Sequence, residues 1–281
     1  METREPRSRI VLLGTGTPNA EPERSGPALA VVVDETAYLV DFGPGVVRRA
    51  AAATEAGIEA LTVTRLEQAF VTHLHSDHTA GYADLIFTPW VLGRERPLRV
   101  YGPRGLKAMT DHVVAAYRED VRQRLDGLEP ANRTGHRVEP TEIEPGVIYE
   151  DDRTTIEAFA VNHGTWPAYG YRFTTPDRCF VVAGDTAPFD GWETAYADCD
   201  ILVHEVQSAE GLARRDPAWR AYHTAVHTTT IDLAAVASVA RPGRIVLTHV
   251  LLHGASEADL LREIRQRYVG EVVLGRDLAV Y

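Results

Sequence analysis

Two kinds of apolar pattern alternate along this chain. Short apolar runs between Gly, Pro and charged residues predict strands at 9–14, 28–42, 68–72, 154–161, 168–174, 178–183, 200–204 and 244–249. Apolar residues at near-helical spacing predict a helix at 105–125, and further helices are predicted at 46–56, 228–240 and 256–268. The tail, 271–274 and 278–281, predicts a closing hairpin or two short strands.

This order of elements favours two stacked sheets between helical layers, in one domain that spans residues 1–281. A chain of 281 residues is long enough to bury a substantial core. Residues 126–146 are rich in Gly, Pro and charge, and they predict either a loop over a cleft or an irregular surface connection. With the preceding helix they form an insertion at about 105–147, which we expect near the functional cleft.

Three imidazoles and a carboxylate lie within residues 73–78, which read His-Leu-His-Ser-Asp-His directly after an apolar run. Neutral imidazole and carboxylate are ligands that zinc and iron accept. Alternation in an extended segment places His73 and His75 on one side, and a following turn brings in Asp77 and His78. A single His beside a strand is usually a packed or surface residue. Four potential ligands in six residues favour a metal site.

Further ligand candidates stand at the ends of later apolar runs. His163 follows 156–161, Asp185 follows 179–184, and His249 follows 245–248. Strand ends that project such side chains into one cleft can assemble a site on a rigid sheet. Each residue alone also fits a turn or cap. Together they supply one His for each of two metals and a carboxylate to bridge them.

The chain resembles the metallo-β-lactamase superfamily of metallohydrolases. The matching motifs are residues 73–78, His163, Gly184-Asp185-Thr186 and His249, and the resemblance extends over nearly the whole chain from Leu13-Gly14-Thr15-Gly16-Thr17-Pro18 and Asp41-Phe42-Gly43. It implies a four-layer αββα sandwich with two divalent metal ions, zinc first and iron or manganese as alternatives. Drug-hydrolysing members usually place a Cys at the second metal, where this chain has Asp185, which argues against β-lactam hydrolysis.

The same resemblance implies how the ligands divide. One metal takes His73, His75 and His163. The second takes Asp77, His78 and His249, and Asp185 bridges the two.

Within the superfamily the chain looks most like the ribonuclease Z-like branch. The opening 13–18, the pair His204-Glu205 after a strand, and the loop His227-Thr228-Thr229 are typical of that branch. The resemblance implies three catalytic residues. Asp77 accepts a hydrogen bond from the nucleophile, His227 acts on the scissile group, and Glu205 orients His227. The alternative for His227 is a helix-capping role alone.

Two features depart from the tRNA-processing members. Those proteins carry an arm that grips tRNA between the third His ligand and the bridging Asp, and here only residues 164–184 separate His163 from Asp185. The Arg-Tyr that usually follows the last His is missing after His249. Cyclic phosphodiesterases and arylsulfatase-like enzymes have the shorter spacing.

The composition of the chain limits the classes of partner that we expect. A net charge of −11 and a pI of about 5.5 disfavour long nucleic acid, which is bound through Lys and Arg contacts to phosphate, although a local basic patch can persist on an acidic protein. Two cysteines indicate no disulfide framework. Residues 1–7 have no apolar signal region, which favours a cytoplasmic location, and no apolar stretch approaches the ~20 residues of a membrane span.

Aromatic residues near the candidate ligands predict a partly apolar substrate pocket: Trp166, Tyr169, Trp192 and Tyr222. Each of them also fits a core position. Such a pocket favours a compact aryl or nucleoside group over a long polymer.

We therefore expect a dinuclear metal-dependent hydrolase in which a metal-activated hydroxide attacks the substrate. The first expectation is a phosphodiesterase for a small or cyclic phosphodiester. An arylsulfatase, or a lactone or carboxylic ester hydrolase, would use the same site on a small anionic or aryl ester. A tRNA 3′-processing endonuclease and a non-catalytic metal-binding protein are the remaining alternatives. Homodimers are common in the families that the chain resembles.

Overall fold

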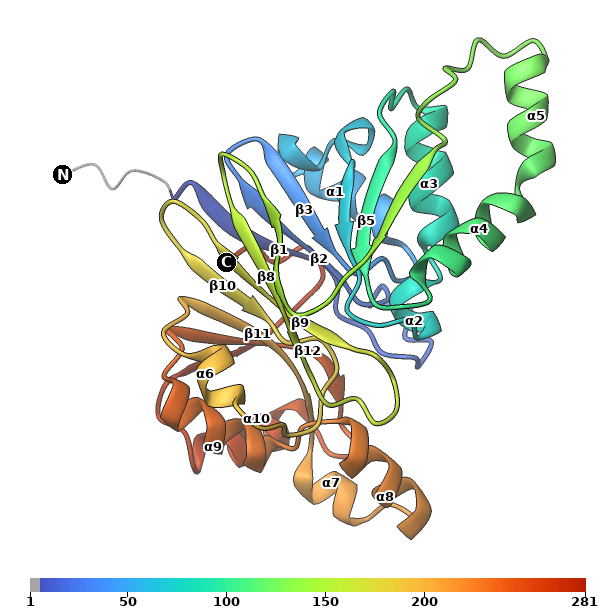
Figure 1. Cartoon of the computed structure of the whole chain (residues 1–281). Helices are drawn as coiled ribbons and strands as arrows, with labels where there is room; N and C mark the ends of the chain where they lie inside the picture. Colours follow the sequence, from blue (N-terminus) through green and yellow to red (C-terminus); the bar gives the residue numbers. More distant parts are fainter. Residues whose placement is uncertain (1–5) are drawn as a thin grey trace. The chain divides into compact units, whose positions relative to one another are not determined.

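A computed structural model describes residues 6–281, whose contacts divide into two compact units. Unit 1 comprises residues 6–143 together with Arg276–Tyr281, and unit 2 comprises Glu144–Gly275 (Figure 1). That the whole chain forms one domain stays a prediction. No helix between residues 6 and 281 is long and apolar enough to cross a membrane.

Within its described residues, unit 1 has a mixed six-stranded sheet. Its strands, in both chain and sheet order, are β1 (Ser8–Gly14), β2 (Ala28–Val33), β3 (Thr36–Val40), β4 (Gln68–Phe70), β5 (Leu98–Gly102) and β6 (Val138–Glu142). The first three pair antiparallel and the rest pair parallel. β2 reads Ala-Leu-Ala-Val-Val-Val and is buried throughout, as a strand covered on both faces requires.

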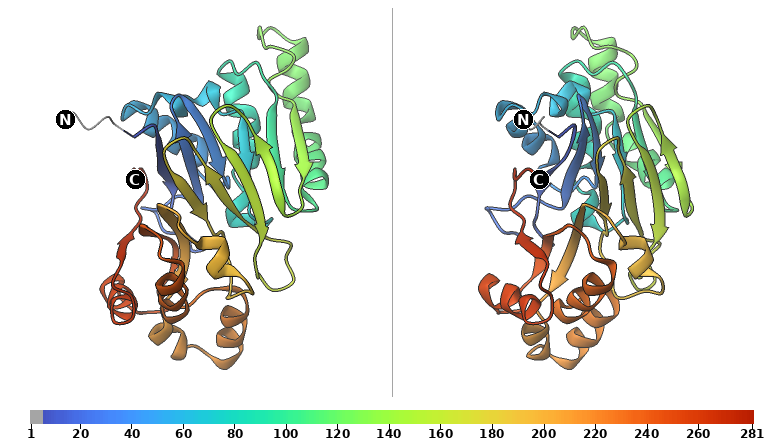
Figure 2. Two further views of the ribbon diagram at one scale, coloured as in Figure 1. Left: turned by 60° about the vertical axis from the view of Figure 1, so that its left-hand side comes forward. Right: turned by 90° about the vertical axis from the view of Figure 1, so that its left-hand side faces the viewer.

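The helices of unit 1 lie in the connections between these strands (Figure 2). They are α1 (Val46–Glu55), α2 (Ser76–Thr79), α3 (Tyr82–Val91), α4 (Leu106–Ala116) and α5 (Arg118–Asp126), with short 3₁₀ turns at Glu59–Leu61 and Val63–Arg65. α1 buries Val46, Val47, Ala50 and Ala53, which share one face at helical spacing. These residues join Leu39 and Val100 of the sheet in one hydrophobic cluster.

The last residues of the chain return to β1. The N–H of Tyr281 donates to the carbonyl of Ile10 at 2.9 Å, and the N–H of Ile10 donates back at 3.0 Å. The tail therefore forms no hairpin with 271–274. Of the two short strands predicted as the alternative, 271–274 is a strand, and 278–281 contributes an isolated bridge between Val280 and Val11. Asp277 adds a side-chain anchor, because its carboxylate accepts the backbone N–H groups of Thr15 and Ser25.

Unit 2 contains a mixed seven-stranded sheet in the order β13-β12-β11-β10-β9-β8-β7. Its strands are β7 (Gly146–Glu150), β8 (Thr155–Ala160), β9 (Tyr169–Thr174), β10 (Cys179–Val182), β11 (Ile201–Gln207), β12 (Arg244–Leu251) and β13 (Glu271–Leu274). The strands from β7 to β10 pair antiparallel, and those from β10 to β13 pair parallel.

Five helices of unit 2 connect or flank the later strands: α6 (Trp192–Tyr196), α7 (Ala209–Ala213), α8 (Pro217–Val226), α9 (Thr230–Ala240) and α10 (Glu257–Arg265). Leu233 and Ala237 of α9 and Leu260 of α10 pack into one cluster with Leu202 and Leu247 of the sheet. A capping box at Ser256 and Asp259 begins α10.

Several predicted elements differ from the structure. The helix predicted at 105–125 is interrupted at Tyr117, whose ring packs against Phe87 at 4.8 Å, so α4 and α5 are separate helices. The segment 126–146 includes β6, the edge strand of the sheet, and is only partly a loop. α3 was not predicted, because it is apolar on most faces and contains Pro89, so it shows little helical periodicity.

Candidate metal centre

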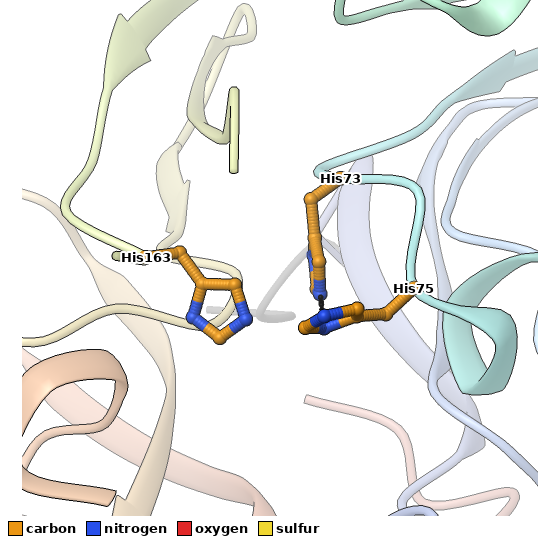
Figure 3. A group of neighbouring side chains, drawn as sticks. All are labelled: His73, His75 and His163. Carbon is orange, nitrogen blue, oxygen red and sulfur yellow. Dashed lines mark hydrogen bonds between the residues drawn. The ribbon is translucent and has the colours of Figure 1, made fainter. Parts of the chain in front are cut away.

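In unit 1, the segment after β4 carries His73 and His75 into the loop that leads to α2. Nε2 of His73 lies 3.0 Å from Nδ1 of His75, with the two rings edge to face (Figure 3). Ligands commonly lie beyond the carboxyl ends of parallel strands, which is where β4 delivers these rings. Two imidazole nitrogens turned toward one point fit a divalent metal.

His78, in α2, is oriented by a carboxylate from another strand. Oδ2 of Asp41 lies 2.7 Å from its Nδ1, and Oδ1 of Asp41 accepts the backbone N–H of Thr72 at 2.7 Å. Asp41 directly follows β3 and has a φ of 60°, a left-handed conformation that Asp tolerates better than most residues. With Nδ1 bound to a carboxylate, Nε2 of His78 is the nitrogen placed to coordinate a metal.

Asp77, the second residue of α2, lies beside His78, with its Oδ2 3.5 Å from Nε2 of His78. A Cβ at Gly43 would come within 2.5 Å of the Asp77 carbonyl oxygen, so the close approach of these two loops requires glycine there. Asp77 also lines a cavity of about 550 Å³ with Ser76 and residues 17–21 and 24–26. We call His73, His75, Asp77 and His78 the unit 1 ligand group.

In unit 2, His163 follows β8, and its ring orientation is defined by a backbone contact. Its Nδ1 donates to the Val226 carbonyl at 2.8 Å, which leaves the lone pair on Nε2. Burial lowers the pKa of His163, so the ring stays in the neutral form that can coordinate a metal. His163, Asp185 and His227 offer ligand atoms within 4.8 Å of one another.

Asp185 follows β10, and His249 lies within β12 near its carboxyl end. Oδ2 of Asp185 lies 3.4 Å from Nε2 of His249. The pairing of β11 with β12 runs from Glu205–Thr248 directly to Val206–Val250, so His249 is an extra residue in the register. Such a bulge redirects a side chain, and the φ of 44° at His249 shows the local distortion. His163, Asp185 and His249 form the unit 2 ligand group.

Glu205 and His227 form a buried pair beside that group. Nδ1 of His227 lies 3.1 Å from Oε1 of Glu205 and 4.0 Å from Oδ2 of Asp185. The same Glu205 oxygen accepts the backbone N–H groups of Thr186 and Thr228. These contacts fix the carboxylate, which in turn orients the imidazole and can stabilise its protonated form.

The predicted pocket aromatics occupy different environments. Trp166 and Tyr222 are about half exposed, at 43% and 47%. Tyr169 is buried on β9. Trp192 packs in the hydrophobic cluster of unit 2 beside Tyr196, which favours a packing role for it.

The sequence analysis did not identify Asp41 as a candidate functional residue. Asp41 lies within a family motif, and its place at a strand end was the signal that could have identified it.

Comparisons with known proteins agree on the fold. The family described as the beta-lactamase superfamily domain matches residues 36–250. Ribonuclease Z of Mycobacterium bovis is 32% identical over 280 residues, which cover 96% of each chain. The metallo-beta-lactamase fold protein YhfI from Bacillus subtilis has a TM-score of 0.73 at 18% identity, over 98% of each chain. Human tRNase Z, short form, has a TM-score of 0.70 at 22% identity, over 97% of this chain and 98% of that chain. The α/β fold class predicted from the sequence is confirmed.

One prediction is wrong: that long nucleic acid is disfavoured as a partner. A relative that aligns over 96% of both chains is a ribonuclease, an enzyme that acts on nucleic acid. The net charge of −11 is an average over the whole chain and does not report the charge beside the site.

Proposed function

The chain belongs to the metallo-β-lactamase superfamily, in its ribonuclease Z-like branch, and from this premise we propose that it is a phosphodiesterase that cleaves RNA. It is a metal-dependent hydrolase, as the family and the His and Asp groups imply. The proposed substrate is a precursor tRNA with a 3′ extension, because human tRNase Z shares the fold and ribonuclease Z of Mycobacterium bovis is 32% identical over 96% of this chain.

The proposed metal ligands are the two groups described above. His73, His75 and His163 would hold one metal. Asp77, His78 and His249 would hold the other, and Asp185 would serve both. The support is the chemistry of the donors: these are neutral imidazoles and carboxylates, and the Asp41 contact with His78 and the Val226 contact with His163 orient two of the rings. Zinc suits this set, and iron and manganese accept the same ligands.

When bound, two divalent ions lower the pKa of a water toward ~7 and neutralise charge on the phosphate oxygens. Side chains of the protein are proposed to position the attacking water and to protonate the leaving oxygen. Asp77 accepts a hydrogen bond from the attacking water. His227, with Nδ1 toward Glu205, delivers a proton from Nε2 to the leaving oxygen, a contribution of typically ~10²–10⁴ in rate. Glu205 orients His227 and stabilises its imidazolium.

The Glu205–His227 pair is the observation that carries this proposal. A purely structural metal site needs no carboxylate-oriented imidazole beside its ligands, whereas phosphodiester cleavage needs a proton donor for the leaving oxygen. A non-catalytic metal-binding role is therefore the weaker alternative.

A second candidate is a phosphodiesterase for a small or cyclic diester. The segment between His163 and Asp185 consists mainly of the β9–β10 hairpin, which favours a compact substrate. Arylsulfate and lactone or carboxylic ester hydrolysis would use the same metals, and the motifs do not separate them from phosphodiester cleavage.

A rate comparison on metal-quantified protein tests the proposal. The substrates are a tRNA-like RNA with a 3′ extension, bis(p-nitrophenyl) phosphate, p-nitrophenyl sulfate and an aryl ester. We expect the highest kcat/KM on the RNA, with cleavage at one position next to the folded stem. A preference of orders of magnitude for the sulfate or the carboxylic ester would overturn the proposal, and cleavage of the small diester alone would select the second candidate.

A further inference from the structure

A row of side chains spaced four residues apart ends at His227. Arg215 precedes α8, Trp219 and His223 lie on it, and His227 is its C-terminal cap. Residues four apart share one face of a helix. The rings of Trp219 and His223 are 5.8 Å apart at an interplanar angle of 30°, and those of His223 and His227 are 5.6 Å apart at 29°. The near-parallel rings of Trp219 and His223 therefore form a row along α8 that ends at His227, the candidate proton donor.

The outer end of this row is exposed to solvent. Trp219 is 53% exposed, and Tyr222, edge to face with it at 6.0 Å, is 47% exposed. Within residues 217–226, Val226 is the residue that α8 buries, so packing does not explain these two large aromatic side chains. In Figure 1, α7 and α8 extend from the sheet of unit 2 as a separate projection. Exposed aromatic clusters of this kind mark interaction surfaces.

The charge around this row is positive, although the whole chain is acidic. Three exposed arginines belong to the row or lie next to it in sequence: Arg214, Arg215 and Arg220. The two nearby carboxylates have other partners. Glu210 pairs with Arg262 at 3.6 Å, and Asp216 accepts the N–H of Ala218 and so caps α8. Among residues 6–281, no carboxylate lies within ion-pair distance of these three guanidinium groups.

The guanidinium of Arg215 lies over the Trp219 ring, with its central carbon 5.8 Å from the ring centroid, which is a cation–π distance. Trp219 is still 53% exposed, so a base can reach the part of the ring that Arg215 leaves uncovered. Aromatic side chains interleaved with arginine are how proteins bind single-stranded nucleic acid without reading its sequence: bases stack on the rings and arginines contact the phosphates. Protein interfaces are also rich in Trp, Tyr and Arg, and RNA is the favoured occupant here because the chain belongs to the ribonuclease Z-like branch.

We propose that α8 is a stacking surface for the unpaired nucleotides of an RNA substrate beside its scissile bond. Bases stack on Trp219 and Tyr222, and the three arginines contact the backbone. This inference rests on the proposed function and adds the element that holds the single strand. From Trp219 to His227 the helix rises roughly 12 Å at ~1.5 Å per residue, which matches about three stacked bases at ~3.4 Å each.

The test compares the RNA and bis(p-nitrophenyl) phosphate on the full-length, metal-loaded protein. Trp219→Ala is expected to lower kcat/KM on the RNA by about 10- to 100-fold, and the loss on the small diester is expected to be at least tenfold smaller. Trp219→Phe, which keeps an aromatic ring, should restore most of the RNA activity. The matched control is Tyr117→Ala, an aromatic side chain of similar exposure, 44%, in unit 1, which should retain both activities.

A series of abasic substrates separates stacking from a structural effect. Single abasic nucleotides are placed in turn at each unpaired position next to the scissile bond. In the wild type, about three consecutive positions should each reduce kcat/KM, and in Trp219→Ala the same substitutions should cause little further loss. Equal abasic losses in both proteins, or equal losses of Trp219→Ala on RNA and on the small diester, would overturn the inference.

Binding without cleavage gives an independent measurement. In the His227→Ala variant, a ten-nucleotide uridine oligomer should quench the Trp fluorescence, and adding Trp219→Ala should remove most of that quenching. If Trp219→Ala instead alters the oligomeric state on a sizing column and leaves quenching and RNA rates unchanged, α8 is a protein interface. If the wild type cleaves the small diester but neither cleaves nor binds RNA, the proposed function itself fails, and this inference fails with it.

Discussion

Nδ1 of His227 lies 3.1 Å from Oε1 of Glu205, and that oxygen also accepts the N–H groups of Thr186 and Thr228. Three donors converge on one buried carboxylate oxygen, so the carboxylate has little freedom to rotate. The fixed carboxylate in turn fixes the orientation of the His227 imidazole. A preorganised proton donor of this kind needs no rearrangement when the leaving oxygen develops charge.

Replacing His227 with Ala should lower turnover by about 10²–10⁴-fold and leave the metal content near that of the wild type. The reason is that His227 is proposed to donate a proton and not to ligate a metal. Elemental analysis and steady-state rates on the same preparation measure both quantities. His112→Ala, an exposed His on α4, is the control. Loss of a metal together with activity would mean that His227 is a ligand.

Replacing Asp41 with Asn should weaken metal binding by about 10- to 100-fold, because the carboxylate that orients His78 is lost. Competition with a chromogenic chelator measures the affinity. Asp34→Asn is a matched control, since Asp34 also has a positive φ, 51°, but pairs with Arg7 at the surface. Unchanged affinity in Asp41→Asn would show that the contact is dispensable.

His223 and His253 should make the protein less stable as the pH falls from about 6.5 to about 4. Burial, reinforced by Arg215 and neighbouring imidazoles, lowers the pKa of each ring from 6.5 to about 4. In this window the unfolded chain binds protons that the folded chain does not, so the stability present in full above pH 6.5 is lost toward pH 4.

The Tm measured at pH 7.5, 5.5 and 4.5 reports this loss. A double variant, His223→Gln with His253→Gln, should show a shallower fall than the wild type. His112→Gln should follow the wild-type curve. Identical slopes in all three proteins would rule out a contribution from these two half-buried rings.

Replacing Arg94 with Leu should lower the free energy of unfolding by about 3 kcal/mol or more, because buried carbonyl groups lose a charged donor. The Arg94 guanidinium is buried and donates to four backbone carbonyls, those of Leu66, Leu85, Ile86 and Gly135. Urea denaturation of apo protein measures the change. Arg96→Leu, at an exposed ion pair with Glu67, should change the stability by less than about 0.5 kcal/mol. Similar losses in the two variants would show that the buried hydrogen bonds add little.

The strands around the ligands were predictable because each is a short apolar run with clear boundaries. The prediction at 178–183 contains β10, and that at 244–249 covers most of β12. α8 was missed because its residues combine apolar, basic and aromatic types with weak apolar periodicity. The ligand assignments and the single domain stay predictions, since both depend on how distant parts of the chain meet.

By itself, the sequence determined the donor types, their local spacing and the family, because ligand chemistry and strand periodicity are properties of short segments. It could not determine that Asp41 meets His78, 37 residues later, and it placed Glu205 beside His227 only through the family resemblance. The contact between Asp41 and His78 follows from the parallel strands β3 and β4 ending at the same edge of a sheet, and strand order is decided only when the whole core packs. The row of rings on α8 depends on both the sequence and the tertiary structure. The four-residue spacing is visible in the sequence, but only the tertiary structure places the last ring, that of His227, against the Glu205 carboxylate.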